Sequence, residues 1–462
     1  MIRDNTDLFE NKPISRAVIT LIIPTVISQI ITVIYNMADT FFIGQMGDPN
    51  QVAAATLVMP PFIMLAAISN LFGIGGASLI SRSLGSGDRE RARRCAGFSI
   101  WGAAVVALVY GLLFYLLRPV LFPFLGADDA TYGFCADYVL WTIAIGSVPT
   151  VLNACLAHLV RAEGYSREAG IGVALGGLLN IVLDPLLMFP LGMGLVGAAV
   201  ATMLSNTVAM LYFVVLLYKN RATTVISLSP RAFTLRGGIP KEILLVGFPG
   251  SLMTFMAIIS NTVLNKMVVS YSNQAIAGMG IAKKIDLLAL AIANGMTQGV
   301  LPLIGYNFAA GNFARMRAAI KTAFTYAMAV AIAGTVLLFT CAVPIVTVFI
   351  GDAETVAYGQ HFLRIISITC PAISVNMMII SIFQATGQKL KPLFLSLLRK
   401  GGLDVPFMVI MDAVAGANGI PWATPIADLL AMTASIILFI PYAKRLGGAF
   451  GRAPSSPDTA DT

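Results

Sequence analysis

The chain has 462 residues, of which 57% are hydrophobic and 11% charged. Soluble domains carry about 25% charged residues, so the composition excludes a soluble globular protein and predicts that lipid surrounds most of the chain. The formal net charge of +8 would suit a nucleic-acid binder. The basic residues, however, gather in every second polar break between apolar stretches, which indicates membrane topology and no nucleic-acid partner.

The apolar stretches predict the fold class. Each is long enough to cross a hydrocarbon core of about 30 Å as a helix, and the alternating strands of about ten residues that form membrane barrels are absent. Because only helices and closed barrels satisfy every backbone group in lipid, we predict an all-α polytopic membrane protein with twelve transmembrane helices. The predicted spans are 17–43, 52–80, 95–117, 132–160, 169–190, 195–218, 242–270, 275–306, 318–340, 355–386, 392–412 and 420–442.

An internal repeat divides these spans into two lobes. Pro24 and Asn36 of the first span match Pro249 and Asn261 of the seventh, at an offset of 225 residues. Six spans per half give both halves the same topology, as in transporters built from parallel repeats. We therefore predict a cytoplasmic N-terminal tail (1–16), an N-lobe of helices 1–6 (17–218), a cytoplasmic inter-lobe linker (219–240), a C-lobe of helices 7–12 (241–442) and a disordered cytoplasmic C-terminal tail (443–462).

The basic residues predict the orientation. With the N-terminus inside, the inner segments hold 23 of the 30 Lys and Arg residues, whereas the outer loops keep only Arg118. The positive-inside rule then places both termini in the cytoplasm of a multi-pass protein in the cell (inner) membrane. The same residues attract anionic lipid head groups, so membrane lipids are expected partners.

Two acids lie inside the predicted N-lobe, where charge is costly and usually functional. Asp39 on span one and Asp184 on span five fall at similar depth, with Asn180 one turn below Asp184 and Thr202 on the returning span six. Two carboxylates, an amide and a hydroxyl form an all-oxygen site suited to a proton or Na⁺. The alternative is that Asp39 lies at the outer interface and Asp184 begins a proline-containing break.

Other polar residues in the spans are candidates for further roles. Pro24 weakens the helical ladder of span one and predicts a hinge, although a static kink fits equally well. The candidate residues of the substrate cavity are Tyr35, Asn36, Asn153, Asn261 and Asn376.

The predicted C-lobe carries paired charges. Lys283 precedes Asp286 by three residues, and Arg399 and Lys400 precede Asp404, spacings that predict ion pairs within a helix. Asp428 has no partner within its own helix. We therefore hold Asp428, Lys283, Asp286 and Arg399 as secondary candidates.

These stretches resemble the multidrug and toxic compound extrusion (MATE) family over nearly the whole chain. The most specific matches are Tyr35 to Gly44 (YNMADTFFIG), Asn70 to Gly76 (NLFGIGG), Gln298 to Asn307 (QGVLPLIGYN) and Pro425 to Asp428 (PIAD). The chain is most similar to the DinF-like branch, and this resemblance implies that Asp39, Asn180, Asp184 and Thr202 couple transport to H⁺ or Na⁺. Asp404 departs from the apolar residue that is usual in the family's Arg-to-Pro stretch.

The resemblance implies a secondary active antiporter that exchanges H⁺ or Na⁺ for amphipathic, often cationic, organic compounds. We expect a monomer with no cofactor beyond the coupling ion. One alternative is a flippase of lipid-linked precursors in the same superfamily, which a basic central cavity and additional spans would favour. A membrane-embedded enzyme would need a catalytic constellation at one depth, and the sequence offers none.

Overall fold

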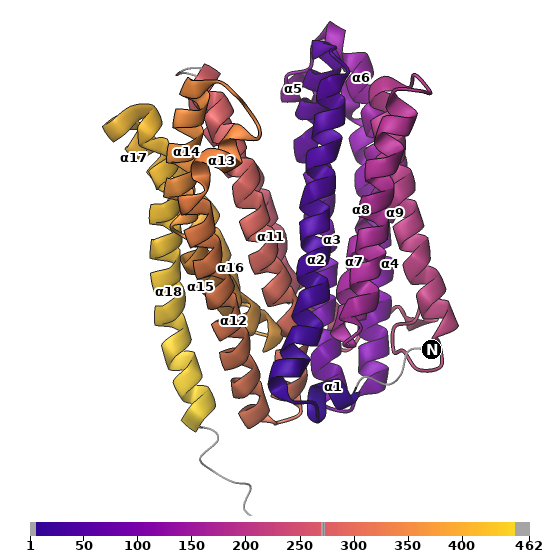
Figure 1. The fold of residues 1–462 in the computed structure, drawn as a ribbon. Helices are drawn as coiled ribbons and strands as arrows, with labels where there is room; N and C mark the ends of the chain where they lie inside the picture. Colours follow the sequence, from indigo (N-terminus) through magenta and orange to yellow (C-terminus); the bar gives the residue numbers. More distant parts are fainter. Residues whose placement is uncertain (1–5, 269–270, 272, 449–462) are drawn as a thin grey trace, which may run out of the picture.

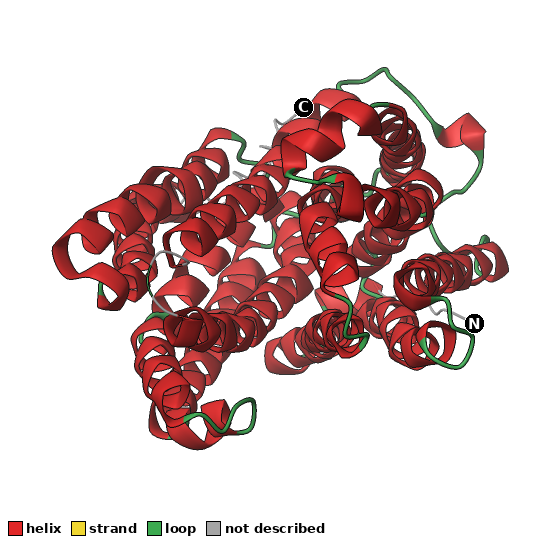
Figure 2. Ribbon diagram, turned by 90° about the horizontal axis from the view of Figure 1, so that it is seen from above, coloured by secondary structure: helices red, strands yellow, loops and turns green. Residues whose placement is uncertain are grey.

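The computed structural model describes residues 6–268, 271 and 273–448, and these form helices and loops without strands (Figures 1 and 2). The predicted disordered tail lies mainly outside the described residues. The first half contains α1 (Thr6–Glu10), α2 (Ile14–Gln45), α3 (Pro49–Gly85), α4 (Arg89–Leu116), α5 (Arg118–Leu125), α6 (Asp129–Val139), the π-helix η1 (Leu140–Ile145), α7 (Ser147–Ala162), α8 (Ser166–Met188) and α9 (Gly194–Lys219). A connection containing the 3₁₀ turn η2 (Pro230–Ala232) leads to the second half.

The second half follows the same order of elements. It contains α10 (Ile239–Val268), α11 (Asn273–Ala309), α12 (Phe313–Thr340), α13 (Ala342–Thr347), α14 (Ala353–Ser367), α15 (Cys370–Ala385), α16 (Leu390–Leu397), the π-helix η3 (Leu398–Asp404), α17 (Val405–Ala415), the 3₁₀ turn η4 (Gly416–Asn418) and α18 (Ile420–Gly448). Figure 1 shows the two halves as separate bundles, which we call the N-lobe and the C-lobe.

The twelve-helix, two-lobe prediction is confirmed. Among the described residues, nine helices are long and apolar enough to span a membrane, and the bent pairs α6–η1 with α7 and α14 with α15 raise the number to 11. The remaining span is the run α16–η3–α17. It is interrupted by a π-helix and contains Arg399, Lys400 and Asp404, which explains why its composition alone does not identify it as a membrane helix.

The lobes meet at one end and diverge at the other. We call the meeting end the basic end, because it carries α1, the last turns of α18 and Arg-rich turns such as the one at the start of α4. The opposite end is the open end (Figure 1). The contact between the lobes consists of close helix approaches. A Cβ on Gly75 of α3 would collide with the carbonyl oxygen of Ile243 in α10, and one on Gly295 of α11 would lie 2.6 Å from Cα of Val26 in α2. We call these contacts the seam.

Polar links reinforce the seam. Ser78 Oγ donates to the carbonyl oxygen of Gln384 at 2.5 Å, and Gln29 Nε2 donates to Gln298 Oε1 at 3.3 Å. At the basic end, Arg91 Nη2 lies 3.1 Å from Glu242 Oε1. The basic ends of the two lobes are therefore held together by backbone contact and by side-chain pairs.

The N-terminal segment crosses from one lobe to the other. It leads into α2 of the N-lobe, but Phe9 of α1 stacks on Tyr306 of the C-lobe with ring centroids 4.9 Å apart. Arg315 of α12 donates to the carbonyl oxygens of Leu8, Phe9 and Lys12. The predicted tail thus contains a short helix docked on the C-lobe.

The helix starts at the open end display the internal repeat. Asp128 caps α6 by accepting from the backbone N–H of Thr131 at 3.0 Å, and Asp352 caps α14 by accepting from that of Thr355 at 2.9 Å. In both caps the threonine hydroxyl also donates to the aspartate. Hydrogen bonds from the threonines hold the pKa of both aspartates below the ordinary value.

Candidate functional site

Three of the predicted site residues form a buried cluster between α8 and α9. Asn180 Nδ2 donates to Asp184 Oδ1 at 3.0 Å and lies 3.3 Å from Thr202 Oγ1. Asp184 is 0% exposed and Asn180 2%. The i,i+4 spacing on α8 aligns the amide with the carboxyl group, and the return of α9 beside α8 brings in the hydroxyl.

Asp39 of α2 completes this group. It is buried and lies within electrostatic range of Asp184, although the two acids do not share a hydrogen bond. We call Asp39, Asn180, Asp184 and Thr202 the N-lobe cluster. Three of its oxygens, Asp39 Oδ1, Asp184 Oδ2 and Asn180 Oδ1, are buried without a hydrogen-bond partner. Buried polar atoms without a partner are rare, and such oxygens can accept a proton or bind an ion or a water molecule.

Small residues bring the three helices of the cluster together. A Cβ on Gly177 of α8 would lie 2.9 Å from the Tyr35 ring of α2, and one on Gly197 of α9 would lie 2.8 Å from the backbone of Leu187. Helices approach this closely only where side chains are missing, as is common in membrane bundles. The glycines of α8 and α9 therefore set the short distances in the cluster.

The sequence analysis did not select Tyr138 of α6. This tyrosine is buried and lies within electrostatic range of both Asp39 and Asp184. In the sequence it is one aromatic residue at the start of an apolar run, which is typical of packing. Only the tertiary position of α6 reveals its proximity to the acids.

The candidate cavity residues separate into two groups. Asn36 and Asn261 are exposed and Tyr35 is partly exposed, whereas Asn153 and Asn376 are buried. Asn153 Nδ2 donates to Asn206 Oδ1 at 3.0 Å inside the N-lobe. Asn153 and Asn376 therefore each lie inside a lobe in this conformation.

Helix α2 continues without a break through Pro24, the predicted hinge, where Gly170 of α8 packs closely.

The C-lobe contains its own buried cluster, made of charged pairs. Arg399 Nε donates to Asp428 Oδ1 at 2.6 Å. Asp428, which has no partner on its own helix, is therefore paired with a residue of the π-helix η3. Lys400 Nζ pairs with Asp404 Oδ2 at 2.9 Å, and Lys283 Nζ lies 3.9 Å from Asp286 Oδ2.

Asp404 has the most partners in this cluster. It accepts from Ser260 Oγ at 2.7 Å and from Thr424 Oγ1 at 3.2 Å, in addition to its bond with Lys400. Asp404 therefore links α10, α18 and the π-helix η3. We call Ser260, Lys283, Asp286, Arg399, Lys400, Asp404, Thr424 and Asp428 the C-lobe cluster.

The two clusters lie on helices that correspond in the repeat. The first, fifth and sixth spans of each half contribute to them: α2, α8 and α9 in the N-lobe, and α10, α16–η3–α17 and α18 in the C-lobe. The C-lobe cluster also takes Lys283 and Asp286 from α11, the second span of its half. In the C-lobe, side-chain cations lie beside the acids. In the N-lobe cluster the hydrogen-bond partner of Asp184 is a neutral amide, so a cation has to come from outside if the acids are ionised.

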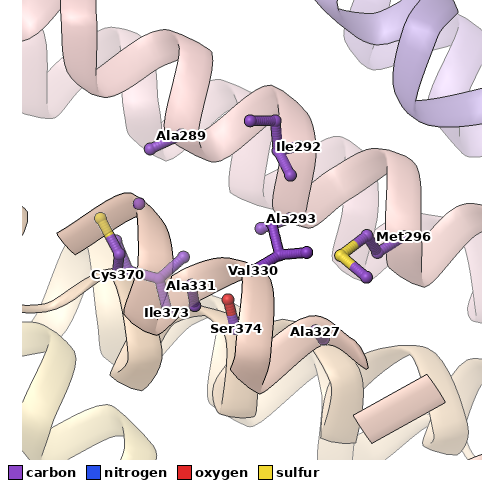
Figure 3. A pocket seen from close by; sticks show the side chains of 11 residues that line it. Ala289, Ile292, Ala293, Met296, Ala327, Val330, Ala331, Cys370, Ile373 and Ser374 are labelled. Carbon is purple, nitrogen blue, oxygen red and sulfur yellow. The ribbon is translucent and has the colours of Figure 1, made fainter. Parts of the chain in front are cut away.

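An apolar pocket lies inside the C-lobe between α11, α12 and α15. Ala289, Ile292, Met296, Val330 and Ile373 are among its lining residues (Figure 3). Ser374 is the single hydroxyl in this lining. The pocket offers mainly contact for hydrocarbon, with the Cys370 thiol and the Ser374 hydroxyl as its side-chain polar groups.

The fold and the N-lobe cluster define a secondary transporter. Two six-helix lobes from one repeat, a seam at one end and a buried acid pair are the components of alternating access in a membrane carrier, not of an enzyme. The profile of the MatE family matches residues 24–186 and 249–410. The chain belongs to this family, so the resemblance inferred from the sequence is confirmed.

Characterised relatives agree over nearly the whole length. The chain is 30% identical over 433 residues to the multidrug export protein MepA of Staphylococcus saprophyticus, covering 94% of this chain and 95% of that protein. The identity to MepA of Staphylococcus aureus strain MSSA476 is also 30%, with the same coverage.

Solved structures match the fold. A MATE crystal structure in complex with MaD3S has a TM-score of 0.89 at 25% identity, covering 98% of this chain and all of that one. The outward-facing conformation of a multidrug resistance MATE transporter of the MOP superfamily has a TM-score of 0.87 at 26% identity, also covering 98% of this chain and all of that one.

Proposed function

We propose that this protein is a secondary active multidrug exporter that exchanges H⁺ or Na⁺ for chemically diverse amphipathic, often cationic, organic compounds. Relatives that share 30% identity over 94% of the chain are named multidrug export proteins. A single chain contains both lobes and both clusters, so a monomer suffices for the cycle.

The observation that carries the coupling assignment is the set of unpartnered oxygens in the N-lobe cluster. Asp39 Oδ1, Asp184 Oδ2 and Asn180 Oδ1 face no donor. A buried carboxylate without a counter-charge is strongly disfavoured, so the site is complete only when it holds a proton or a cation. Oxygen ligands suit hard cations such as Na⁺, and the same oxygens accept protons.

The C-lobe cluster supports placing the coupling ion in the N-lobe. Its acids are paired with Arg399, Lys400 and Lys283, which already supply positive charge. An arriving Na⁺ would meet these cations and be repelled. The N-lobe cluster offers no such competitor.

The orientation proposed from the sequence gives the cycle a direction. With the basic end in the cytoplasm, the seam closes the inner side and the lobes diverge towards the outside. We propose the lobe boundaries 17–218 and 241–442 as the moving bodies, joined by the linker 219–240. Bending of α2 near Pro24 would move Asp39, some 22 Å further along the helix, and so connect ion binding to the seam.

The test is efflux of preloaded ethidium from pump-deficient bacterial cells. We expect fast efflux with the wild type and at least about tenfold slower efflux with Asp39→Asn or Asp184→Asn, because each removes a charge that the ion neutralises. Asp137→Asn, which alters an exposed acid on α6, is the matched control and should retain the wild-type rate. Vesicles with only a pH gradient or only a Na⁺ gradient then identify the ion.

The possible outcomes separate the two parts of the proposal. Fast efflux from both variants would leave the exporter and remove the coupling site. No efflux from the wild type, with the protein detected in the membrane, would overturn multidrug export itself.

The flippase alternative depends on a basic central cavity. The cations Lys283, Arg399 and Lys400 are each paired with an acid within the C-lobe cluster. The geometry therefore favours export of soluble amphiphiles over a lipid-linked anion held by several cations at once.

A further inference from the structure

One buried arginine of the N-lobe has no acidic partner. Arg161, in the last turn of α7, is 4% exposed. Its Nε atom is buried without a hydrogen-bond partner, and within the described part of the chain its guanidinium forms no ion pair. Glu163, the acid nearest to it in the sequence, accepts instead from Thr224 Oγ1 and from the backbone N–H of Val225 in the linker. A buried cation without a counter-charge is costly, so the surroundings of Arg161 call for an anion.

Arg161 lines a small cavity between the two lobes. The lining residues are Ile74 and Ala77 of α3, His158 and Arg161 of α7, and Gln298, Leu301 and Pro302 of α11. Ile74 adjoins Gly75, which approaches the backbone of Ile243 in α10, so the cavity lies in the seam. Its volume of about 10 Å³ admits one particle of about the size of a water molecule.

The polar side chains of this lining present N–H groups to the cavity. Arg161 Nη1 lies 3.5 Å from His158 Nδ1. An arginine only donates, so His158 Nδ1 accepts and the neutral imidazole carries its proton on Nε2. Gln298 Oε1 accepts from Gln29 Nε2, which leaves the two N–H groups of the Gln298 amide as donors. Three donor side chains in an otherwise apolar lining are the complement of an anion.

A water molecule suits the cavity less well than an anion. The side-chain acceptors of the lining, His158 Nδ1 and Gln298 Oε1, already accept from Arg161 and Gln29, so they are not free for the protons of a water. The C-terminal end of α7 carries the equivalent of about half a negative charge and offsets only part of the guanidinium charge. A bound anion neutralises the remainder.

We propose that the seam binds a monatomic anion, chloride in the cell, between Arg161 of the N-lobe and Gln298 of the C-lobe. Carboxylate and phosphate groups are too large for the cavity. Because both lobes line it, the site comes apart when the lobes separate at the basic end. A bound anion therefore stabilises the conformation with the closed seam, as any ligand stabilises the state that binds it. This inference concerns an anion that regulates the lobes and is independent of the coupling ion in the N-lobe cluster.

The test compares halides with larger anions at one ionic strength. We expect chloride and bromide, but not sulfate or gluconate, to raise the melting temperature of the purified wild type saturably, by on the order of 1–3 °C. Crystals grown in bromide should show anomalous density in the cavity beside Arg161. Chloride should also lengthen the distance between spin labels on Asp129 and Glu354, which are exposed near the open end, because a closed seam keeps the lobes apart there.

Three variants assign the effect to the cavity. Arg161→Gln should abolish the response to halides. Gln298→Leu and Gln29→Leu both remove the hydrogen bond between Gln29 and Gln298, but only Gln298→Leu removes a donor from the cavity. Gln298→Leu should therefore raise the chloride concentration for half of the effect at least about tenfold, since a hydrogen bond to a charged group is lost. Gln29→Leu is the matched control and should respond as the wild type.

The outcomes separate this site from the export function. A wild type that responds alike to chloride and gluconate would show that the cavity holds water only and would overturn the proposal. A halide response that persists in Arg161→Gln, or that is equal in Gln298→Leu and the wild type, would place the anion elsewhere. If Arg161→Gln does not fold, the pair of glutamine variants and the bromide density still decide. None of these measurements uses a substrate, so a wild type that exports no ethidium would leave the anion site standing.

Discussion

Asn180 Nδ2 lies 3.0 Å from Asp184 Oδ1, one helical turn further along α8, and holds this carboxyl group with a neutral donor. The second oxygen of Asp184 remains without a partner. A neutral donor orients the acid without supplying the charge that would replace a coupling ion. Asn180 is thus a positioning residue of the proposed coupling site.

Asn180→Ala should therefore weaken ion coupling. Loss of a hydrogen bond to a charged group costs about 1.5–3 kcal/mol, so the ion concentration for half-maximal ethidium efflux should rise at least about tenfold. Thr207→Val on α9 is the control, since the Thr207 hydroxyl bonds only within its own helix at Met203. An unchanged midpoint in Asn180→Ala would show that the amide does not hold the acid in the working site.

Breaking the Arg399–Asp428 pair should destabilise the C-lobe. Both side chains are almost fully buried, at 2% and 1% exposure. Removing one partner of such a pair costs about 3–5 kcal/mol, because the other charge stays buried alone. We expect Arg399→Met to lower the melting temperature of the purified protein. Unfolding is detected with a thiol-reactive dye that becomes fluorescent when the buried cysteines are exposed. Arg399→Met with Asp428→Leu should recover most of the loss, and failure of this recovery would contradict a pairwise origin.

Gly75→Ala should force the seam apart. A methyl group there would collide with the carbonyl oxygen of Ile243, and backbone atoms of α10 yield only if the helix moves. We expect a shorter distance between spin labels on Asp129 and Glu354, both exposed near the open end, because lobes that part at the basic end approach each other at the open end. Gly334→Ala on α12, where a Cβ meets nothing within 4 Å, should leave the distance distribution unchanged. Identical distributions for the two variants would contradict a tight seam.

Arg315→Ala should release α1 from the C-lobe. The guanidinium binds three carbonyl oxygens of the N-terminal segment, at Leu8, Phe9 and Lys12. Without it, the segment keeps the stacking of Phe9 on Tyr306 and the hydrogen bonds that Tyr306 donates to Glu10 and Asn307 donates to the Phe9 carbonyl oxygen. We expect faster amide hydrogen exchange and faster proteolysis within residues 6–12, whereas Lys321→Ala, further along α12, should not change either rate. Protection equal to that of the wild type would show that the contacts with Tyr306 and Asn307 hold α1 without Arg315.

The caps at Asp128 and Asp352 should weaken in acid. Hydrogen bonds in the folded protein hold both pKa values below the ordinary value of about 3.9. A group with a lowered folded pKa contributes stability above its unfolded pKa and loses it as the pH falls through the folded pKa. Exchange at the starts of α6 and α14, corrected for the intrinsic rate, should therefore increase below about pH 4. Asp128→Asn and Asp352→Asn should remove this pH dependence at their own helix while keeping a cap. A pH response that persists in these variants would assign it to other groups.

Much of the fold could be predicted from the sequence, because lipid imposes strict rules on length and polarity. The apolar runs predicted twelve helices, and the matching of Pro24 with Pro249 predicted the lobes. The eleventh span, 392–412, was among these helices, although Arg399, Lys400 and Asp404 lie within its π-helix η3. These charges are tolerated because partners from other helices reach them, and such partners are a tertiary property.

The site was predictable where its contacts are local. Asn180 and Asp184 are four residues apart on one helix, and Thr202 follows on the next span, so depth alone grouped them. The Arg399–Asp428 pair joins two helices, and Tyr138 reaches the acids only through the position of α6. The residue spacing in the sequence predicts neither of these two contacts. The docked α1 is five residues long, too short for periodicity to reveal it.

The seam has a consequence for how the rate of alternation responds to temperature. At Gly75 and Gly247 the backbones of α3 and α10 are in contact, so few interdigitated side chains have to separate when the lobes part. The step mainly hydrates apolar surface around residues such as Ile74 and Ile243, and such hydration carries a positive heat capacity. The Arrhenius plot of turnover should therefore be curved, with an activation enthalpy that grows as the membrane warms.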